Sequence, residues 1–248
     1  MRMLTFIAVA VCLLAVPLLA QPVPDPASVG RTTGDFHGCA PEGDFARPEG
    51  AHSEPFLSAL KNRDLAPDSF KAMTVTHIIS DAAPLATAAG KKRRTAWTAA
   101  QRSSIAAREA SGIVVTGFLA GVKKEDVEAC NCHDADRVDR HVWLVARPGQ
   151  KRSQSMVIEI SPRMLDKHPD WPALATAAWR KGFRVRISGW RTWDQEHPEQ
   201  LRERTNNNGS VTHATRATLW EIHPIHRVEV ETENGDFVDV DDADLSGE

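Results

Sequence analysis

The sequence predicts a mainly β protein with minor α, built around a small closed barrel of five strands. Three observations lead to this fold class. Five segments between residues 112 and 230 alternate apolar and polar residues, as half-buried strands do. One helical segment separates the third of them from the fourth. Gly117 and Gly121 lie where the first strand of a barrel has to bend. A helix between strands 3 and 4 of five strands is the order of an OB-fold, a small Greek-key barrel.

The strands are expected at residues 112–122, 140–147, 154–161, 183–194 and 216–230. Pro172 lies just inside the start of the helix between the third and fourth strands, and Gly182 lies just past its end. A β-sandwich is the alternative, but it would need more strands and no helix in the middle of the domain. We therefore expect an OB-fold-like barrel over residues 111–230.

Residues 1–20 have the pattern of a secretory signal peptide. Arg2 supplies a basic start, residues 3–19 are almost wholly apolar, and Ala20 is a small residue before the expected cleavage point. An uncleaved membrane anchor is the alternative, although Pro17 interrupts a run that is at the lower limit for a membrane span. The pattern predicts an exported protein, periplasmic or secreted, with no transmembrane span after cleavage.

Residues 21–110 are expected to form an N-terminal arm with short helices. Residues 21–55 are rich in proline and glycine and are expected to be irregular, and residues 56–66 have the composition of a short helix. Residues 73–79 alternate like a strand. A second helix is expected from about Thr95 to the residues before Gly112. This organisation predicts an arm that lies on the barrel without a large core of its own.

Residues 231–248 carry eight acidic side chains and no basic one, which predicts a solvated, disordered tail. The whole chain has a net charge of −3, so residues 21–230 carry about +4. That charge is far from the strongly basic composition of a typical nucleic-acid binder.

Several short motifs resemble those of a known group of proteins. The segments "VTGFL", "DRHVWL", "SMVIEISPR", "VRISGW" and "RATLWEIHPI" are similar to a group of uncharacterised exported bacterial proteins. In that group an OB-like module follows a region like "GCAPEGD … LSALKNR", which spans residues 38–63 here. The chain is more distantly similar to the periplasmic bacterial OB-fold family linked to envelope stress. The resemblance implies an OB-like fold and export, and it implies no reaction.

Residues 129–141, "ACNCHDADRVDRH", concentrate reactive side chains between the first and second strands. OB-folds often carry binding loops at this position. A zinc site needs about four ligands from cysteine, histidine or carboxylate side chains, and this loop offers five. The Cys-x-Cys spacing differs from the two-residue turn that is common between zinc ligands. The candidate metal ligands, with Zn as the candidate cofactor, are Cys130, Cys132, His133, Asp139 and His141.

A disulfide is the competing interpretation of the same cysteines. The chain after the signal peptide keeps Cys39, Cys130 and Cys132, and an oxidising compartment permits one bond among them. A bond from Cys39 to either of the other two would attach the arm to the barrel, with up to about 4 kcal/mol of stabilisation in the chain-entropy description. Free thiols are the third interpretation.

The remaining candidate residues lie on the predicted strands. Two arginines and a tryptophan on one face of the fourth strand are of the types that bind single-stranded nucleic acid or another polyanion, but a bulge at Gly189 would turn Trp190 into the core. Carboxylates on the third and fifth strands, with a histidine, are the other candidates. The candidate ligand-binding residues are Arg184, Arg186, Trp190, Glu159, Glu221 and His223.

We find no nucleophile, zinc-protease or phosphate-loop motif. The sequence therefore favours an exported, non-enzymatic OB-fold binding module of the cell envelope, with an unknown ligand. The alternatives are a metal-binding protein or metal-dependent hydrolase that uses the 130–141 loop, and a protein that binds single-stranded nucleic acid or another polyanion.

Overall fold

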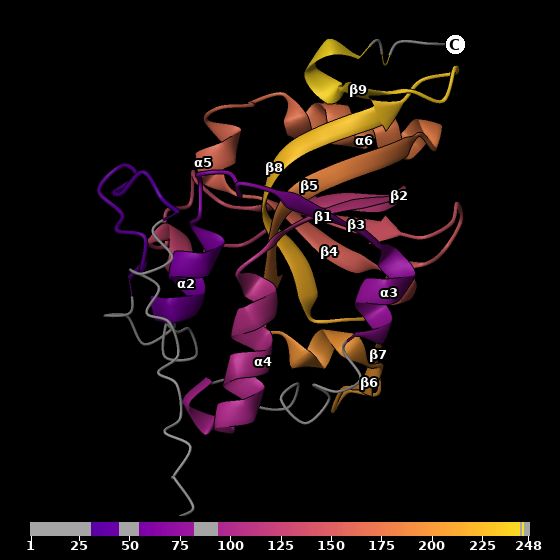
Figure 1. Ribbon diagram of the computed structural model, residues 1–248. Coiled ribbons are helices and arrows are strands. Elements are labelled where there is room, and N and C mark those ends of the chain that lie inside the picture. Colours follow the sequence, from indigo (N-terminus) through magenta and orange to yellow (C-terminus); the bar gives the residue numbers. More distant parts are fainter. Residues whose placement is uncertain (1–30, 45–54, 82–93, 244, 246–248) are drawn as a thin grey trace, which may run out of the picture.

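Five long strands close into a barrel in the computed structural model of the protein, which describes residues 31–44, 55–81, 94–243 and 245 (Figure 1). The strands pair in the order β2–β3–β4–β8–β5, and β5 returns to β2. The pairing of β4 with β8 is parallel, and the others are antiparallel. The strands are β2(Gly112–Lys124), β3(Arg140–Val145), β4(Met156–Ile160), β5(Arg184–Trp193) and β8(Trp220–Glu231). The predicted fold class, an OB-fold-like barrel, is confirmed.

Two helices lie between the third and fourth barrel strands, where one was predicted. The short α5(Pro162–Leu165) precedes α6(Trp171–Lys181), which packs against β2. Helix α6 ends at Gly182, whose positive φ of 69° lets the chain reverse at low cost. The helix buries Trp171, Ala175 and Ala178 on one face.

Alternate residues of the barrel strands form the hydrophobic core. Val142 and Leu144 of β3, Ile158 of β4 and Ile222 of β8 all belong to the core cluster. Successive side chains of a strand point to opposite faces of the sheet. Residues next to these in sequence therefore face away from the barrel interior, and among them are most of the polar side chains described below.

The N-terminal arm adds helices and one more strand to the outside of the barrel. Strand β1 pairs in parallel with the first half of β2. The arm consists of α2(Pro55–Lys61), β1(Phe70–Thr74), α3(Val75–Ser80), the 3₁₀ turn η3(Arg94–Ala96) and α4(Ala99–Glu109). The strand predicted over residues 73–79 is correct only for Met73 and Thr74, because helix α3 begins at Val75. Thr74 caps a helix there, because its side chain accepts a hydrogen bond from the backbone N–H of His77.

The start of the acidic C-terminal segment is attached to the barrel, unlike the disordered tail expected from residue 231. Strand β9(Phe237–Asp239) pairs with β8, and the turn η7(Val240–Asp242) follows. Asp241 accepts hydrogen bonds from Trp171 Nε1 at 3.0 Å and contacts His168 Nδ1 at 2.8 Å. Side chains at the start of α6 thus hold an acidic residue of this segment in place, although it stays exposed.

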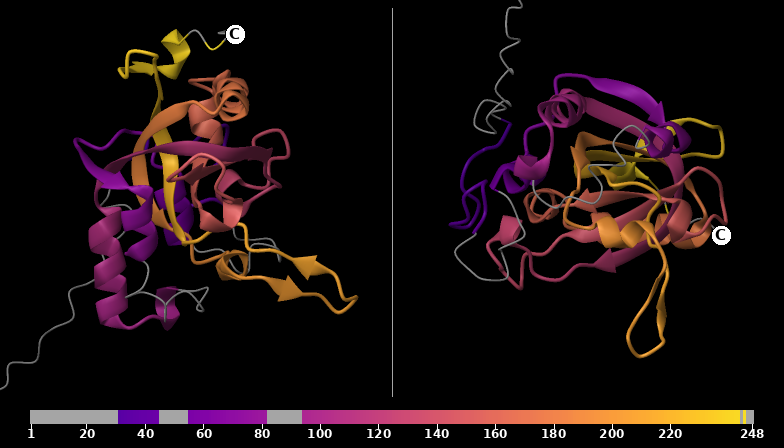
Figure 2. Two further views of the ribbon diagram at one scale, coloured as in Figure 1. Left: turned by 90° about the vertical axis from the view of Figure 1, so that its right-hand side faces the viewer. Right: turned by 90° about the horizontal axis from the view of Figure 1, so that it is seen from below.

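The long connection between β5 and β8 carries a separate hairpin, β6(Arg204–Thr205) with β7(Val211–Thr212), which projects from the body of the protein (Figure 2). It is preceded by η6(Pro198–Leu201). Two further 3₁₀ turns, η4(Ala129–Asn131) and η5(Arg152–Gln154), lie in the loops between β2, β3 and β4. The chain that returns from the hairpin to β8 brings Arg216 to the barrel.

In the part of the chain that the structure describes, no helix is long and apolar enough to cross a membrane. The predicted signal peptide, residues 1–20, lies outside the described residues.

Candidate metal centre

A row of polar side chains crosses three neighbouring strands on the outer face of the barrel. His141 of β3 is directly opposite Glu159 of β4. Val157 is the parallel partner of Glu221 on β8, so continuing that register two residues further places Glu159 beside His223. The arm and the loops bury the row almost completely, and the exposed fractions of His141, Glu159 and His223 are 5%, 3% and 1%.

Asp139, which precedes β3, joins this row at His223. One atom each of Asp139, Glu159 and His223 lies within 4.8 Å of the other two. His223 Nδ1 is 3.1 Å from Glu159 Oε2, and His223 Nε2 is 3.9 Å from Asp139 Oδ1. Glu221 Oε2 is a further neighbour, 3.7 Å from His223 Nδ1. We call Asp139, Glu159 and His223 the buried triad.

Arg216 neutralises the carboxylates on one side of the triad. Its Nη1 atom donates to Glu221 Oε1 at 2.5 Å and to Asp194 Oδ2 at 3.0 Å. Asp194 in turn contacts His197 Nδ1 at 2.7 Å. The side chain of Arg216 is 1% exposed, so this charge serves the buried network alone.

The two carboxylates of the triad have no such cation. The ion-pair partners of Asp139 and Glu159 are histidines, and no lysine or arginine among the described residues forms an ion pair with either. The triad therefore depends on histidine for its positive charge, and a buried carboxylate without a cation beside it is costly to ionise.

Two polar atoms around the triad have no hydrogen-bond partner among the described residues. They are Asp139 Oδ1 and Glu221 Oε2. Glu159 Oε2 and His223 Nδ1 partner each other at 3.1 Å. Buried polar atoms in native proteins are nearly always satisfied by protein, water or an ion. The two unpartnered oxygens both lie beside His223, at 3.9 Å from Nε2 and 3.7 Å from Nδ1.

The protonation of the triad reflects this environment. Burial raises the pKa of Asp139 to about 8, although the charge of His223 opposes the shift. Burial disfavours the charged form of His223, but Glu159, Glu221 and Asp139 outweigh it and raise the pKa of His223 to about 10. Burial also disfavours ionised Glu159, yet the charge of His223 holds the pKa of Glu159 below its usual range. Without a metal ion, the triad therefore holds protons on Asp139 and His223 at neutral pH.

A second group of ligand types adjoins the triad and shares Asp139 with it. Cys130 Sγ is 3.2 Å from Glu128 Oε2 and 4.0 Å from Asp139 Oδ2. Asn131 Nδ2 donates to the same Oδ2 atom at 2.9 Å. Lys61 of α2 donates to Glu128 Oε2 at 3.0 Å, with its side chain 2% exposed. Burial and Glu128 raise the pKa of the Cys130 thiol well above its usual value.

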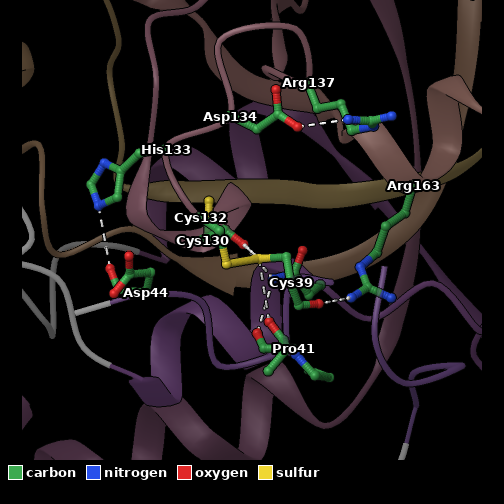
Figure 3. The surroundings of a disulfide bond; sticks show 11 residues. Cys39, Pro41, Asp44, Cys130, Cys132, His133, Asp134, Arg137 and Arg163 are labelled. Atoms are coloured by element: carbon green, nitrogen blue, oxygen red, sulfur yellow. Dashed lines mark hydrogen bonds and ion pairs between the residues drawn. A yellow bond between two sulfur atoms is a disulfide. The ribbon is translucent and has the colours of Figure 1, made fainter. Parts of the chain in front are cut away.

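The structure pairs Cys39 with Cys132 in a disulfide, with Cα atoms 5.8 Å apart (Figure 3). This is one of the two predicted pairings, and it attaches the arm to the loop after η4. Cys130 is the free, buried thiol. Cys132 has a positive φ of 51°, so the chain turns sharply between the two cysteines and points their side chains to different partners.

The five metal ligands predicted in the 130–141 loop do not come together as one site. Asp139 belongs to the triad and Cys130 lies at its edge. His141 Nδ1 contacts Glu125 Oε1 at 2.9 Å, next to the triad. The Cys132 sulfur is taken by the disulfide, and His133 Nε2 faces the backbone oxygen of Asp44 at 3.3 Å (Figure 3). A loop with local turns cannot aim five neighbouring side chains at one point.

The predicted ligand-binding residues divide into two groups. Glu159, Glu221 and His223 meet at the triad. Arg184 instead pairs with Glu231 at 2.8 Å, and Arg186 pairs with Glu229. Trp190 is 2% exposed, and its Nε1 donates to the backbone oxygen of Leu65 at 2.9 Å. The two arginines and the indole therefore share no exposed surface for a polyanion.

Sequence reasoning missed Lys61, Asp194 and Arg216. They come from the arm and from loops, where no periodic pattern marks them. A signal for the triad was present in the sequence, because Asp139-x-His141 and Glu221-x-His223 each place an acid and an imidazole on one face of a strand. Two such pairs on two strands of one barrel predict a shared polar centre if the strands are close.

Comparison with known proteins finds no family model that matches the chain and no curated protein with significant similarity. The centre is therefore interpreted from its own geometry.

Proposed function

We propose that this protein is a divalent-cation-binding protein whose ion is held by Asp139, Glu159 and His223. The observation that carries the proposal is a buried group of three ligand atoms within 4.8 Å of one another, beside two buried carboxylate oxygens without a hydrogen-bond partner among the described residues. A cation at that point would complete the partners of the triad and would replace the protons on Asp139 and His223.

The donor set favours a divalent first-row ion. Carboxylate oxygens and an imidazole nitrogen are ligands for Zn²⁺ and Mn²⁺, with Zn²⁺ bonds of about 2.0–2.2 Å. Ligands on opposite sides of one ion are then up to about 4.4 Å apart. The three triad atoms lie within 4.8 Å of one another, so a small inward shift brings them to coordinating distance. Glu221 is placed to hold the imidazole of His223 as an outer partner.

The burial of the site supports a structural ion over a catalytic one. The side chains of Asp139, Glu159 and His223 are at most 4% exposed. A catalytic ion needs an open position for water or substrate, whereas structural sites are closed. The proposal therefore keeps the expected non-enzymatic binding module and names its ligand as a metal ion. Export and an envelope partner remain proposals that rest on the N-terminal sequence.

The test is a metal titration of protein freed of metal with a chelator. Native-mode mass and calorimetry with Zn²⁺ and Mn²⁺ should give one ion per chain. Glu159→Gln should weaken binding by more than about 100-fold, because even outer partners of a metal typically contribute 10–100-fold. Glu231→Gln is the matched control, since Glu231 is also a strand carboxylate with a charged partner, but lies far from the triad in its contacts. It should leave affinity unchanged.

Two results would contradict the proposal. One is a chain that stays metal-free at a large excess of both ions. The other is equal affinity in Glu159→Gln and in the wild-type protein. Ordered water would then be the partner of the unsatisfied carboxylate oxygens.

A further inference from the structure

Asp139 faces two groups of ligand types with its two carboxylate oxygens. Its Oδ1 atom is directed to His223, at 3.9 Å from Nε2. Its Oδ2 atom is directed to Asn131 and to the Cys130 sulfur. Ligand atoms of Glu128, Cys130 and Asp139 also lie within 4.8 Å of one another. One carboxylate thus separates two positions that each have the donors for a cation.

The second position already holds a cation of the protein itself. The ammonium group of Lys61 donates to Glu128 Oε2 at 3.0 Å, the oxygen that also contacts the Cys130 sulfur at 3.2 Å. Lys61 is the last residue of α2, and its side chain is 2% exposed. The buried ammonium is thus bonded to a carboxylate oxygen that a second metal ion at this position would need.

An ammonium group and a metal ion place different demands on these donors. The ammonium needs only acceptor oxygens, which lets Cys130 remain a thiol. A metal ion would take the sulfur as thiolate, and soft donors of that kind favour Zn²⁺, Co²⁺ and Cd²⁺ over harder ions. The identity of residue 61 therefore decides whether sulfur is available to a metal.

We infer that Lys61, through its ion pair with Glu128, takes the place of a second metal ion at the Glu128, Cys130 and Asp139 group, and that its ammonium group limits the protein to one metal ion bound by oxygen and nitrogen. The inference rests on the proposed function and assigns a specificity-determining role to a residue outside the triad. It also explains why a lysine is buried against Glu128 without a second acidic partner in ion-pair contact among the described residues.

The test is the stoichiometry and spectrum of Co²⁺ binding to the full chain. The wild-type protein should bind one equivalent and show no sulfur-to-cobalt charge-transfer band in the near ultraviolet. Lys61→Gln and Lys61→Leu should bind two equivalents and gain that band. Adding Cys130→Ser to Lys61→Gln should remove the band and weaken the second equivalent at least tenfold.

Lys123→Gln is the matched control. Lys123 also pairs with a carboxylate of this network, Glu125, at 2.9 Å, but its side chain is 53% exposed. The control should bind one equivalent without a sulfur band. Circular dichroism of each variant before titration identifies the variants that fold. The prediction for the wild-type protein can be tested even if a variant does not fold.

Three results would overturn the inference. Two equivalents or a sulfur band in the wild-type protein would show that Lys61 does not exclude a second ion. One equivalent without a band in folded Lys61→Gln and Lys61→Leu would show that the second position is not a metal site. Zero equivalents in the wild-type protein would overturn the proposed function together with this inference, so the two failures are distinct.

Discussion

Two polar regions of the same barrel differ in the partners of their carboxylate side chains. At the start of β5, Arg184 and Arg186 each form an ion pair with a glutamate on β8. The two arginine side chains are 45% and 35% exposed. At the triad, Asp139 and Glu159 are buried and have only imidazoles as ion-pair partners among the described residues. Each carboxylate of the first region has an arginine, and the exposed Arg184–Glu231 pair is of small energetic value. The second holds its charge balance with protons on Asp139 and His223 in place of a lysine or arginine, and this difference locates the candidate site.

Removing Arg216 should give the largest effect on stability. Arg216→Met would leave Asp194 and Glu221 buried without their cation, and such a loss costs about 3–5 kcal/mol. The solvated counterpart, Arg184→Met, should cost no more than about 1 kcal/mol. Urea unfolding of both variants measures the contrast. Equal losses would mean that burial does not separate the two regions.

Breaking the disulfide should have the next largest effect. The Cys39→Ser/Cys132→Ser double variant should lose about 2–4 kcal/mol, because the unfolded chain is no longer constrained. Metal affinity should also fall, since the loop that carries Asn131 to Asp139 loses its attachment to the arm. Reductant should lower the stability of the wild-type protein and leave the double variant unchanged. A double variant as stable as the wild-type protein would show that the arm stays in place without the bond.

Lowering the pH should reduce the stability of the folded protein at a contact between the arm and the barrel, by less than the two changes above. Burial lowers the pKa of His226 to about 4, and its Nε2 atom contacts the backbone oxygen of Arg63 at 2.9 Å. Lys167 and Arg63 add positive charge nearby, and Asp64 opposes them. The unfolded chain binds a proton here near pH 6.5 and the folded chain does not, so stability is lost as the pH falls from about 6.5 to about 4.

The expected loss from His226 is on the order of 1–3 kcal/mol, at about 1.4 kcal/mol for each unit of pKa difference. Urea midpoints of the wild-type protein and of His226→Gln between pH 7 and pH 4 measure it. The variant should show a shallower decline over this range. Parallel curves would mean that His226 takes up no protons on unfolding.

The barrel could be predicted because its signals are local. Alternating apolar residues, the helix bounded by Pro172 and Gly182, and the bend glycines all lie within single elements. The strand expected over residues 73–79 was shortened because a single hydroxyl, on Thr74, starts a helix instead. Residues 231–243 are ordered against the barrel because β9 pairs with β8 and Trp171 of α6 bonds to Asp241, which composition cannot reveal.

The candidate site was predicted in pieces. Asp139 and Cys130 were assigned to a loop metal site, and Glu159, Glu221 and His223 to a ligand-binding face. They form one centre because β4 pairs in parallel with β8, and this register depends on residues more than sixty positions apart. Lys61 and Arg216 depend on how the arm and the β5–β8 loop fold back, for which a single sequence carries no local signal.

The covering of the triad by the arm has a consequence for the order of events during synthesis. Arg63 bonds to Thr192 and to His226, which are 129 and 163 residues further along the chain. Such contacts close late, because the chain between them has to be made and ordered first. The part of the arm around Arg63 is thus made early but packs onto the barrel late. The proposed ion could therefore be enclosed only once β8, which carries His223, has joined the barrel.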